Sequence, residues 1–279
     1  MKACPYAHRF ELIKSRRDRM PEECGVIGAY DLTGRPVNDI LYYGLYALQH
    51  RGQENAGIAM ADGKVMRYHK GQGLVTDCFD QDEHLDSLGQ GHLGIGHVRY
   101  STAGDSNVVN AQPLVVHYKS GDLALAHNGN LVNADAIRKA LEETGSINQT
   151  SADTEIVANL IARRKDEDLL EALQHTVRDL RGSYALVMLT QDQLIAMRDP
   201  MGIRPLILGK VDDAYVVASE SCAFDTLGGE IIRDVRPGEI IVVDADGLHS
   251  IQTETPLHSD LCIFEFVYFA RTRSEERRV

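Results

Sequence analysis

The sequence predicts an α+β fold in which two sheets are covered by helices. Short apolar runs separated by turn residues begin at Cys24 and continue to about residue 127. A helical stretch follows between about 133 and 180, and strand-like runs return from Tyr184 to Gln252. Two β-rich stretches that bracket a helical middle favour two separate sheets over an alternating parallel βαβ array.

The first β-rich stretch opens with a strand over 24–30 that leads into the turn Asp31-Leu32-Thr33-Gly34. A helix is expected over 37–49, because Ile40, Leu41, Leu45 and Leu48 fall on one face together with Gly44. Further strands are expected at 57–60, 65–69, 93–97, 114–118 and 123–127.

Three helices are expected in the middle of the chain. Asn133 is positioned to cap a helix that reaches Glu143, and Asp153 to cap another that reaches Arg164. The third covers about 169–180. Short strands separated by polar turns then follow at 184–189, 193–198, 206–209, 215–218, 239–243 and 248–252.

Composition excludes several classes of protein. Lys plus Arg number 29 against 41 Asp plus Glu, and the formal charge of −12 disfavours broad binding to nucleic acid or to anionic membranes. The apolar run Cys262–Ala270 is too short for a membrane span and contains Glu265. Residues 1–22 are polar and lack a signal-peptide core, so we expect an exposed leader on a cytoplasmic protein. The five cysteines are an odd number without a CxxC pair, so they predict neither a disulfide framework nor a complete metal site.

Two candidate residues lie at opposite ends of predicted strands. Cys24 opens the first strand, where a cysteine is most often a small buried hydrophobe. Arg99 follows the strand at 93–97 in Gly-His-Val-Arg-Tyr-Ser-Thr-Ala-Gly, and its guanidinium fork matches a carboxylate in two parallel hydrogen bonds. A structural ion pair is the alternative for Arg99.

Three further polar segments have groups that suit amide hydrolysis. In His127-Asn128-Gly129-Asn130, again after a strand, the Asn amide and the Gly N–H could together face an oxyanion, although Asn-Gly is more often a turn. Asp153 could hold a substrate ammonium or only cap its helix. The polar loop 49–57 either faces water or contributes to a site.

Taken together, these segments resemble the class II glutamine amidotransferase domain, and most closely the amino-terminal half of the amidophosphoribosyltransferase family. The resemblance runs from Glu23 to about Arg271. It rests on Glu-Glu-Cys-Gly-Val-Ile-Gly, Gln-His-Arg-Gly-Gln-Glu, Gly-His-Val-Arg-Tyr-Ser-Thr-Ala-Gly, His-Asn-Gly-Asn, Ser-Ala-Asp-Thr-Glu, Arg-Asp-Pro-Met-Gly-Ile-Arg-Pro-Leu and Cys-Ile-Phe-Glu-Phe-Val-Tyr-Phe-Ala-Arg.

The resemblance implies a four-layer αββα sandwich of the N-terminal-nucleophile hydrolases and a role for each candidate. Cys24 is then the nucleophile, and Asn128 and Gly129 form the oxyanion hole. Arg99 holds the α-carboxylate of glutamine and Asp153 its α-ammonium.

Two supporting roles complete the site that the resemblance implies. Thr102 lines the glutamine pocket, and Arg51 orders the loop beside the nucleophile. The implied reaction is hydrolysis of L-glutamine to glutamate and ammonia through a thioester on Cys24, with ammonia used to make 5-phosphoribosylamine in purine biosynthesis. A free α-amine of pKa about 8 is the base for a thiol of pKa about 8.5, so residues 1–23 must first be removed.

The expected organisation is a propeptide at 1–23, the amidotransferase domain at 24–262, and the start of a phosphoribosyltransferase domain at 263–279. Relatives continue after Phe-Ala-Arg, whereas this chain changes to Thr272-Arg273-Ser274 and stops at Val279. We therefore expect the acceptor domain, with its phosphoribosyl pyrophosphate and Mg²⁺, to be absent. The processed chain should then release glutamate and ammonia without forming phosphoribosylamine.

No cofactor or metal is expected in this chain. Cys262 falls where full-length relatives with a propeptide place one iron–sulfur ligand, but the other ligands would lie in the missing half. A homo-oligomer is possible. Two alternatives stay open: another class II amidotransferase, of glucosamine-6-phosphate or asparagine synthesis, and a catalytically silent, unprocessed fragment.

Overall fold

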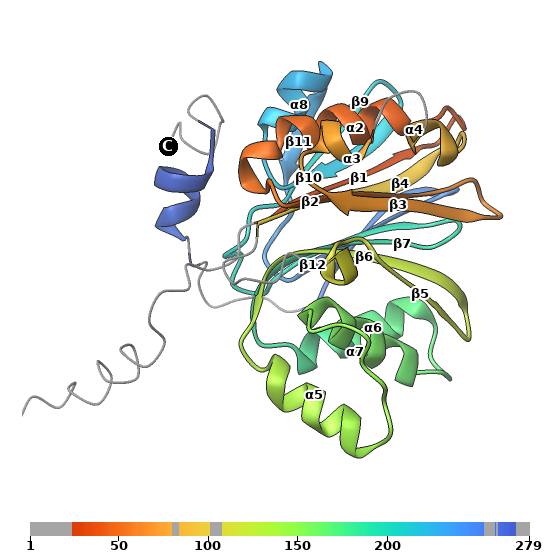
Figure 1. Cartoon of the computed structure of the whole chain (residues 1–279), viewed down its shortest axis with the longest axis vertical. Coiled ribbons are helices and arrows are strands. Elements are labelled where there is room, and N and C mark those ends of the chain that lie inside the picture. Colours follow the sequence, from red (N-terminus) through yellow and green to blue (C-terminus); the bar gives the residue numbers. More distant parts are fainter. Residues whose placement is uncertain (1–23, 80–83, 101–107, 254–259, 261, 272–279) are drawn as a thin grey trace, which may run out of the picture.

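The fold is a four-layer sandwich of two antiparallel sheets with helices on both outer faces (Figure 1). The computed structural model describes residues 24–79, 84–100, 108–253, 260 and 262–271. One sheet has seven strands in the order β11-β9-β10-β1-β4-β2-β3, and the other has six in the order β13-β12-β8-β7-β6-β5. The expected α+β αββα architecture is therefore confirmed.

The seven-stranded sheet contains the strand that follows Cys24. Its strands are β1 (Gly25–Asp31), β2 (Asn55–Ala61), β3 (Met66–Gln72), β4 (Leu93–Arg99), β9 (Ile207–Val211), β10 (Ala214–Ala218) and β11 (Glu230–Asp234). β1 lies between β10 and β4, and Gly25 pairs with Val98. Because the pairing is antiparallel, the chain before β1 and the end of β4 meet at one edge of the sandwich.

The six-stranded sheet contributes the other half of the site. Its strands are β5 (Leu114–Tyr118), β6 (Gly121–Leu131), β7 (Gly182–Leu189), β8 (Leu194–Arg198), β12 (Glu239–Asp244) and β13 (Gly247–Gln252). β6 pairs with β5 and β7, and it lies below β4 across the sandwich.

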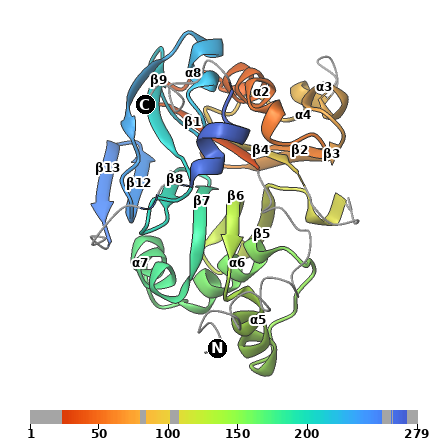
Figure 2. The same ribbon diagram turned by 90° about the vertical axis from the view of Figure 1, so that its left-hand side faces the viewer.

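Helices cover each sheet on the side away from the other sheet (Figures 1 and 2). Over the seven-stranded sheet lie α2 (Asn38–Ala47), α3 (Val75–Cys78), α4 (His84–Ser87) and α8 (Cys222–Leu227), with a short helical turn at Gln49–Arg51. Over the six-stranded sheet lie α5 (Ala134–Glu143), α6 (Asp153–Arg163) and α7 (Leu169–Asp179). Short helices at Val108–Asn110 and Glu265–Phe269 complete the described elements.

Three apolar layers hold the sandwich together. Between the sheets, Val26 and Ile95 pack with Val187. On the outer faces, Ile27 packs with Leu41 of α2, while Leu186 packs with Leu173 of α7. All seven residues of β1 are buried, because both faces of this strand are covered. That explains why the strand is a continuous apolar run in the sequence rather than an alternating one.

The structure corrects the expected environment of three polar residues. Asn128 and Gly129 lie inside β6, paired with β7, so the segment does not follow the strand and is not a turn. Asn133 occupies the position before α5 but does not cap it, because its side chain bonds Asp179 O and Arg181 N across the neighbouring loop. Asp153 is the first residue of α6 rather than its cap, and its carboxylate bonds residues of β6.

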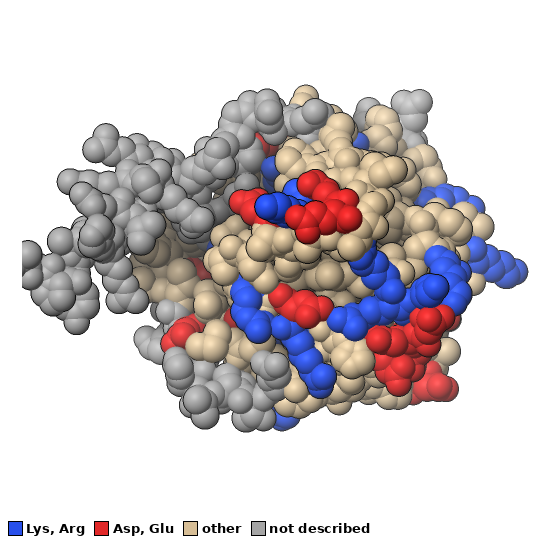
Figure 3. Space-filling view, turned by 90° about the horizontal axis from the view of Figure 1, so that it is seen from below, with Lys and Arg blue, Asp and Glu red and all other residues tan. Residues whose placement is uncertain are grey.

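The outer face of the lower helical layer is charged in a mixed pattern. Figure 3 shows Lys and Arg side chains interspersed with Asp and Glu on this face. Arg164 pairs with Asp179 at 2.8 Å and with Glu167 at 3.5 Å. Such interspersed pairs are typical of a solvated helix surface. Within the described residues, no helix is long and apolar enough to cross a membrane.

Candidate active site

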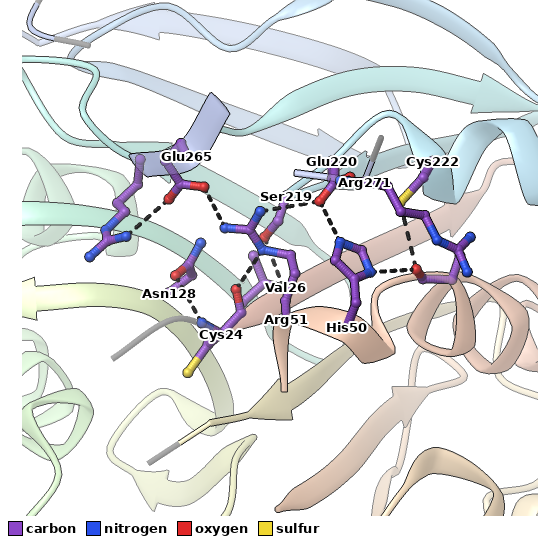
Figure 4. A network of polar contacts seen from close by, with 12 residues as sticks. Cys24, Val26, His50, Arg51, Asn128, Ser219, Glu220, Cys222, Glu265 and Arg271 are labelled. Carbon is purple, nitrogen blue, oxygen red and sulfur yellow. Dashed lines mark hydrogen bonds and ion pairs between the residues drawn. The ribbon is translucent and has the colours of Figure 1, made fainter. Parts of the chain in front are cut away.

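Cys24 lies at the edge of the sandwich where β1 begins, and both of its backbone polar groups are bound. Its backbone nitrogen donates to Asn128 Oδ1 at 3.3 Å, and its carbonyl oxygen accepts from Arg51 Nε at 3.0 Å (Figure 4). The residue is 4% exposed. Two distant segments, one from each sheet layer, therefore fix the position of this cysteine.

The side-chain amide of Asn128 uses its oxygen in a hydrogen bond, whereas its nitrogen has no partner among the described residues. Its Oδ1 faces the nitrogen of Cys24, so its Nδ2 must point elsewhere. Nδ2 is fully buried and has no hydrogen-bond partner among the residues described. A buried donor without a partner costs folding free energy, so such a group is typical of a functional site.

Gly129 holds a conformation that other residues cannot adopt. Its φ is +145°, and a Cβ added there would lie 2.1 Å from the carbonyl oxygen of Ser183 in β7. Only glycine lets β6 keep its pairing with β7 at this point. Asn128 is thereby kept next to Cys24 by a regular strand rather than by a mobile turn.

Arg51 is a buried cation whose guanidinium binds several acceptors. In addition to Cys24 O, Nη1 donates to Glu220 Oε2 at 3.2 Å and Nη2 donates to Glu265 Oε2 at 2.7 Å. Burial raises the pKa of Glu265, but Arg51 and Arg204 outweigh that effect, so the pKa lies below its ordinary value. The carboxylate is therefore ionised, and the cluster is a charge-balanced network.

Arg99 ends β4 on the level of Cys24. The antiparallel register pairs Gly25 with Val98, which places Arg99 opposite Cys24. The guanidinium Nη1 is buried without a hydrogen-bond partner among the residues described. A Cβ on Gly52 would lie 2.6 Å from the backbone of Arg99, so the loop that carries Arg51 packs directly against this strand end.

Asp153 is anchored to β6 by two hydrogen bonds. Its Oδ1 lies 3.0 Å from His127 Nδ1, and its Oδ2 accepts from Leu131 N at 3.1 Å. Burial raises the pKa of Asp153, but the electrostatic interaction with His127 and these hydrogen bonds together lower it by more. The pKa of Asp153 is therefore below its ordinary value. The side chain is 22% exposed, so one edge of an ionised carboxylate stays open to the site.

His97 links the two sheets beneath these groups. It is completely buried, and its Nε2 donates to the backbone oxygen of His127 at 3.1 Å. Desolvation lowers the pKa of His97 to about 3, so the ring is neutral at physiological pH. Because it is neutral and its Nε2 donates, Nδ1 carries the lone pair.

Comparison with known proteins agrees with this arrangement. Residues 97–226 match the family described as a glutamine amidotransferase domain. The amidophosphoribosyltransferase of Bacillus subtilis is 46% identical over 254 residues, covering 91% of this chain and 52% of that protein. The enzyme of Archaeoglobus fulgidus is 46% identical over 253 residues, covering 90% of this chain and 55% of that protein.

A solved structure described as the allosteric regulatory enzyme of purine biosynthesis has a TM-score of 0.86 and 45% identity. The match covers 90% of this chain and 53% of that chain. Residues 97–226 carry a glutamine amidotransferase domain, and about nine-tenths of the chain is similar to part of the amidophosphoribosyltransferases that it matches. The chain spans about half the length of the curated relatives it matches.

Among the expected amidotransferase site residues, the structure brings some into contact and not others. Cys24 contacts Asn128 and Arg51 directly. Arg99 ends β4 and Asp153 begins α6, and among the described residues no hydrogen bond or ion pair joins either of them to Cys24. Thr102 lies outside the described residues.

Sequence reasoning about the amidotransferase motifs missed four buried side chains. His97 lies inside the Gly-His-Val-Arg segment, His127 inside His-Asn-Gly-Asn, and Glu265 inside the segment that begins at Cys262. The sequence alone assigned no role to any of them. Their positions next to Arg99, Asn128 and the chain's final motif were the available signal. No sequence signal pointed to Glu220, because it lies in a short turn between β10 and α8 and outside the motifs.

The described residues contain one group of side chains with the spacing of metal ligands, and Cys262 is not part of it. Cys262 belongs to no group of three or more ligating side chains in the described part of the chain, whereas an iron–sulfur cluster needs four ligands. His50, Glu220 and Cys222 do lie within 4.8 Å of one another. Glu220 Oε2 already lies 2.8 Å from His50 Nε2 and accepts from Arg51 Nη1, so a cation would have to displace both contacts.

Proposed function

We propose that the mature chain hydrolyses glutamine to glutamate and ammonia, with Cys24 as its N-terminal nucleophile. The observation that carries this proposal is the Cys24–Asn128 contact. The nitrogen that would become the free α-amine is 3.3 Å from Asn128 Oδ1, and the other amide group of the same side chain is a buried donor without a described partner. Cys24 then supplies both the base and the nucleophile, and Asn128, which contacts it, supplies an oxyanion donor.

The chemistry follows from these positions. The amine accepts the thiol proton, directly or through water, and the sulfur forms a bond to the side-chain carbonyl carbon of glutamine. Asn128 Nδ2 stabilises the oxyanion together with the backbone N–H of Gly129. Collapse of the intermediate breaks the C–N bond, and the amide nitrogen leaves as ammonia after receiving the proton. Water then cleaves the γ-glutamyl thioester, which regenerates the thiol and releases glutamate.

Two ionised side chains supply the groups for recognition of the amino acid. Arg99 has an unpaired buried Nη1 among the described contacts, which suits the α-carboxylate. Asp153 keeps an open edge and a lowered pKa, which suit the α-ammonium. This assignment provides a cation for one end of the zwitterionic substrate and an anion for the other. Thr102 completes the pocket in this proposal.

The proposed destination of ammonia is a phosphoribosyl group, as in the opening step of purine biosynthesis. The names of the relatives support it: the matched proteins are amidophosphoribosyltransferases, and the similar solved structure is an enzyme of purine biosynthesis. Phosphoribosyl pyrophosphate and Mg²⁺ would then bind in the part of such enzymes that lies beyond the matched half. An acceptor of glucosamine-6-phosphate or asparagine synthesis is the alternative.

Maturation gives the test of the glutaminase proposal. Intact mass should show loss of residues 1–23, and glutamate release should appear only in the shortened protein, because a peptide nitrogen is not a base. Cys24→Ala should retain residues 1–23 and have no activity. Cys78→Ala, which removes another buried thiol, should mature and turn over normally. Full activity from protein that still carries Met1 would refute the mechanism, whereas an inactive protein that keeps Met1 would favour the silent, unprocessed alternative.

A further inference from the structure

The short helix Glu265–Phe269 lies at the edge of the sandwich where β1 begins. In Figures 1 and 2 it stands apart from both helical layers, across the strand ends rather than over a sheet face. Two of its outward side chains, Val267 and Tyr268, are more than 60% exposed, whereas Glu265 is 4% exposed. Among the described side chains of this helix, the carboxylate of Glu265 is therefore one that is buried in the protein.

Glu265 and Glu220 hold Arg51 from two sides. Glu265 Oε2 accepts from Nη2 at 2.7 Å, and Glu220 Oε2 accepts from Nη1 at 3.2 Å (Figure 4). All three residues are at most 4% exposed. A guanidinium bound at both terminal nitrogens cannot rotate about its axis, so its remaining Nε–H is directed at one place. That place is the carbonyl oxygen of Cys24.

The same two carboxylates also fix the two ends of the helix segment, Glu220 by binding the residue after the helix and Glu265 as the helix's own first residue. Glu220 Oε1 accepts from the backbone nitrogen of Arg271 at 2.6 Å, just beyond the helix. Glu265 Oε1 accepts from Arg204 Nη1 at 2.9 Å at its start. Removing the helix from its place would therefore break contacts on both carboxylates at once.

Arg204 is itself held in a fixed loop. Asp199, which is completely buried, accepts from the backbone nitrogens of Met201, Ile203 and Arg204 at 3.0–3.1 Å. This explains the Arg-Asp-Pro-Met-Gly-Ile-Arg-Pro segment as a structural device that presents Arg204 to Glu265. The helix is thus docked against groups that belong to the rigid sandwich.

We infer that Glu220 and Glu265 are positioning residues for the Cys24 nucleophile, acting through Arg51, so that docking of residues 262–271 sets the geometry of the glutaminase site. The inference rests on the proposed function of Cys24. It also assigns the helix to the amidotransferase unit, although the sequence suggested a domain division after residue 262.

The physical argument concerns one peptide group. In the mature protein Cys24 is the first residue, so no preceding peptide restrains it and the Arg51 bond to its carbonyl gains importance. Loss of the Arg51 bond lets that terminal peptide rotate, which moves the amine away from Asn128 Oδ1 and the sulfur away from Nδ2. Displacements of this size are costly to catalysis, whereas the grip of Arg99 and Asp153 on glutamine is untouched. The effect should therefore fall on kcat rather than on KM.

The experiment uses the full chain with Glu265→Gln and Glu220→Gln, each of which keeps the side-chain shape and removes the charge. The matched control is Glu239→Gln. Glu239 is 1% exposed and paired with Arg233 at 2.7 Å, but it lies at the start of β12 in the other sheet and outside the Arg51 network. All three variants should lose stability, as judged by urea unfolding.

Only the two variants in the network should lose turnover. We expect kcat for glutamine hydrolysis to fall at least about tenfold with KM within about twofold, and alkylation of Cys24 by iodoacetamide to shift its pH profile. Glu239→Gln should keep both. If Glu265→Gln does not fold, Glu265→Asp is the substitute, because it keeps the charge on a shorter side chain. Its kcat for glutamine hydrolysis should also fall, but by less.

Unchanged kcat and alkylation in the network variants, or an equal loss in Glu239→Gln, would overturn the inference. Absence of glutaminase activity in the mature unmodified protein would instead refute the proposed function. In that case the alkylation profiles of Cys24 would still show whether the two carboxylates position it.

Discussion

The side-chain oxygen of Asn128 accepts from the backbone nitrogen of Cys24 at 3.3 Å, and this contact decides which way the amide of Asn128 points. The nitrogen of Cys24 is a donor in the unprocessed chain, so Oδ1 must face it and Nδ2 must face away. A strand residue with no freedom to flip is thereby prepared as an oxyanion donor. Such prior organisation avoids a reorganisation cost during the reaction.

Asn128→Asp should therefore reduce catalysis far more than binding. Aspartate keeps the oxygen that faces Cys24 but removes the Nδ2 donor, so kcat should fall by about 100- to 1000-fold with little change in KM. Steady-state glutamate release gives both parameters. The control is Asn38→Asp, another buried asparagine, whose Nδ2 donates to Gly89 O far from the site. A fall of less than about tenfold in Asn128→Asp, with normal maturation, would remove Asn128 from the oxyanion hole.

Gly129→Ala should destabilise the fold itself. A Cβ there would lie 2.1 Å from Ser183 O, at a φ of +145°. Strain and overpacking together should lower the free energy of unfolding by about 3 kcal/mol or more. Gly145→Ala separates the two causes, since Gly145 also has a positive φ of +89° but open space around its Cβ. That control should cost only about 1 kcal/mol. Equal urea midpoints for the two variants would contradict the close approach of β6 and β7.

His97 should make the fold sensitive to mild acid. Burial lowers its pKa to about 3, whereas an unfolded histidine titrates near pH 6.5, so the unfolded chain gains the proton first as pH falls. Stability from the neutral ring is complete above about pH 6.5 and decreases toward pH 3. Between pH 7.5 and pH 5 the loss should be about 2 kcal/mol.

Urea unfolding of the unmodified protein and of His97→Gln measures this loss. Glutamine can present an N–H to His127 O as Nε2 does, but it does not titrate. The variant should be less stable at pH 7.5 yet lose less stability on acidification. An unchanged pH slope in His97→Gln would mean that other groups cause the acid sensitivity.

The sequence predicted an element of the fold correctly when the pattern that marks it was long enough to be recognised. All strands of both sheets except β11 were predicted, and central strands such as β1, β2, β4 and β7 are buried apolar runs between turn residues. The short elements α3, α4, α8 and β11 were missed, because a pattern of four to six residues repeats too few times to be distinguished from a loop. β6 was predicted to end at His127 because Asn-Gly usually marks a turn, yet Gly129 continues the strand with a positive φ.

The site was predicted in its residue types more than in its contacts. The quoted motifs contain Cys24, Asn128 and Arg51, and the structure joins them. Nothing in the sequence paired Arg51 with Glu220 and Glu265, because the partners are separated by 169 and 214 residues. The helix-cap role of Asp153 was also a local interpretation, and the bonds to His127 and Leu131 replaced it.

Arg99→Lys should weaken recognition of the α-carboxylate of glutamine. A lysine keeps the charge but not the fork, and loss of a charged hydrogen bond worth roughly 1.5–3 kcal/mol should raise KM by about 10- to 100-fold. γ-Aminobutyramide, which lacks the carboxylate, tests the assignment. Its hydrolysis should be slow with either protein and should not distinguish them. Normal glutamine kinetics in Arg99→Lys would return Arg99 to a structural ion-pair role.

Asp153→Asn should have the complementary effect on the α-ammonium. The carboxylate already bonds His127 Nδ1 and Leu131 N, and two lone-pair positions remain for a substrate cation. Asparagine keeps one oxygen, so it can retain the Leu131 bond or the His127 bond, but it loses the charge. KM for glutamine should therefore rise by about tenfold or more, since charged hydrogen bonds exceed neutral ones.

Glutaramic acid, which lacks the amino group, separates substrate recognition by Asp153 from a purely structural role. The unmodified protein and Asp153→Asn should hydrolyse this amide with similar kcat/KM, because there is no ammonium to lose. If Asp153 only anchored α6 to β6, the variant would lose activity toward glutamine and glutaramic acid alike. Equal losses on the two substrates would therefore exclude the ammonium contact, whereas a loss confined to glutamine would place the carboxylate at the amino end of the substrate.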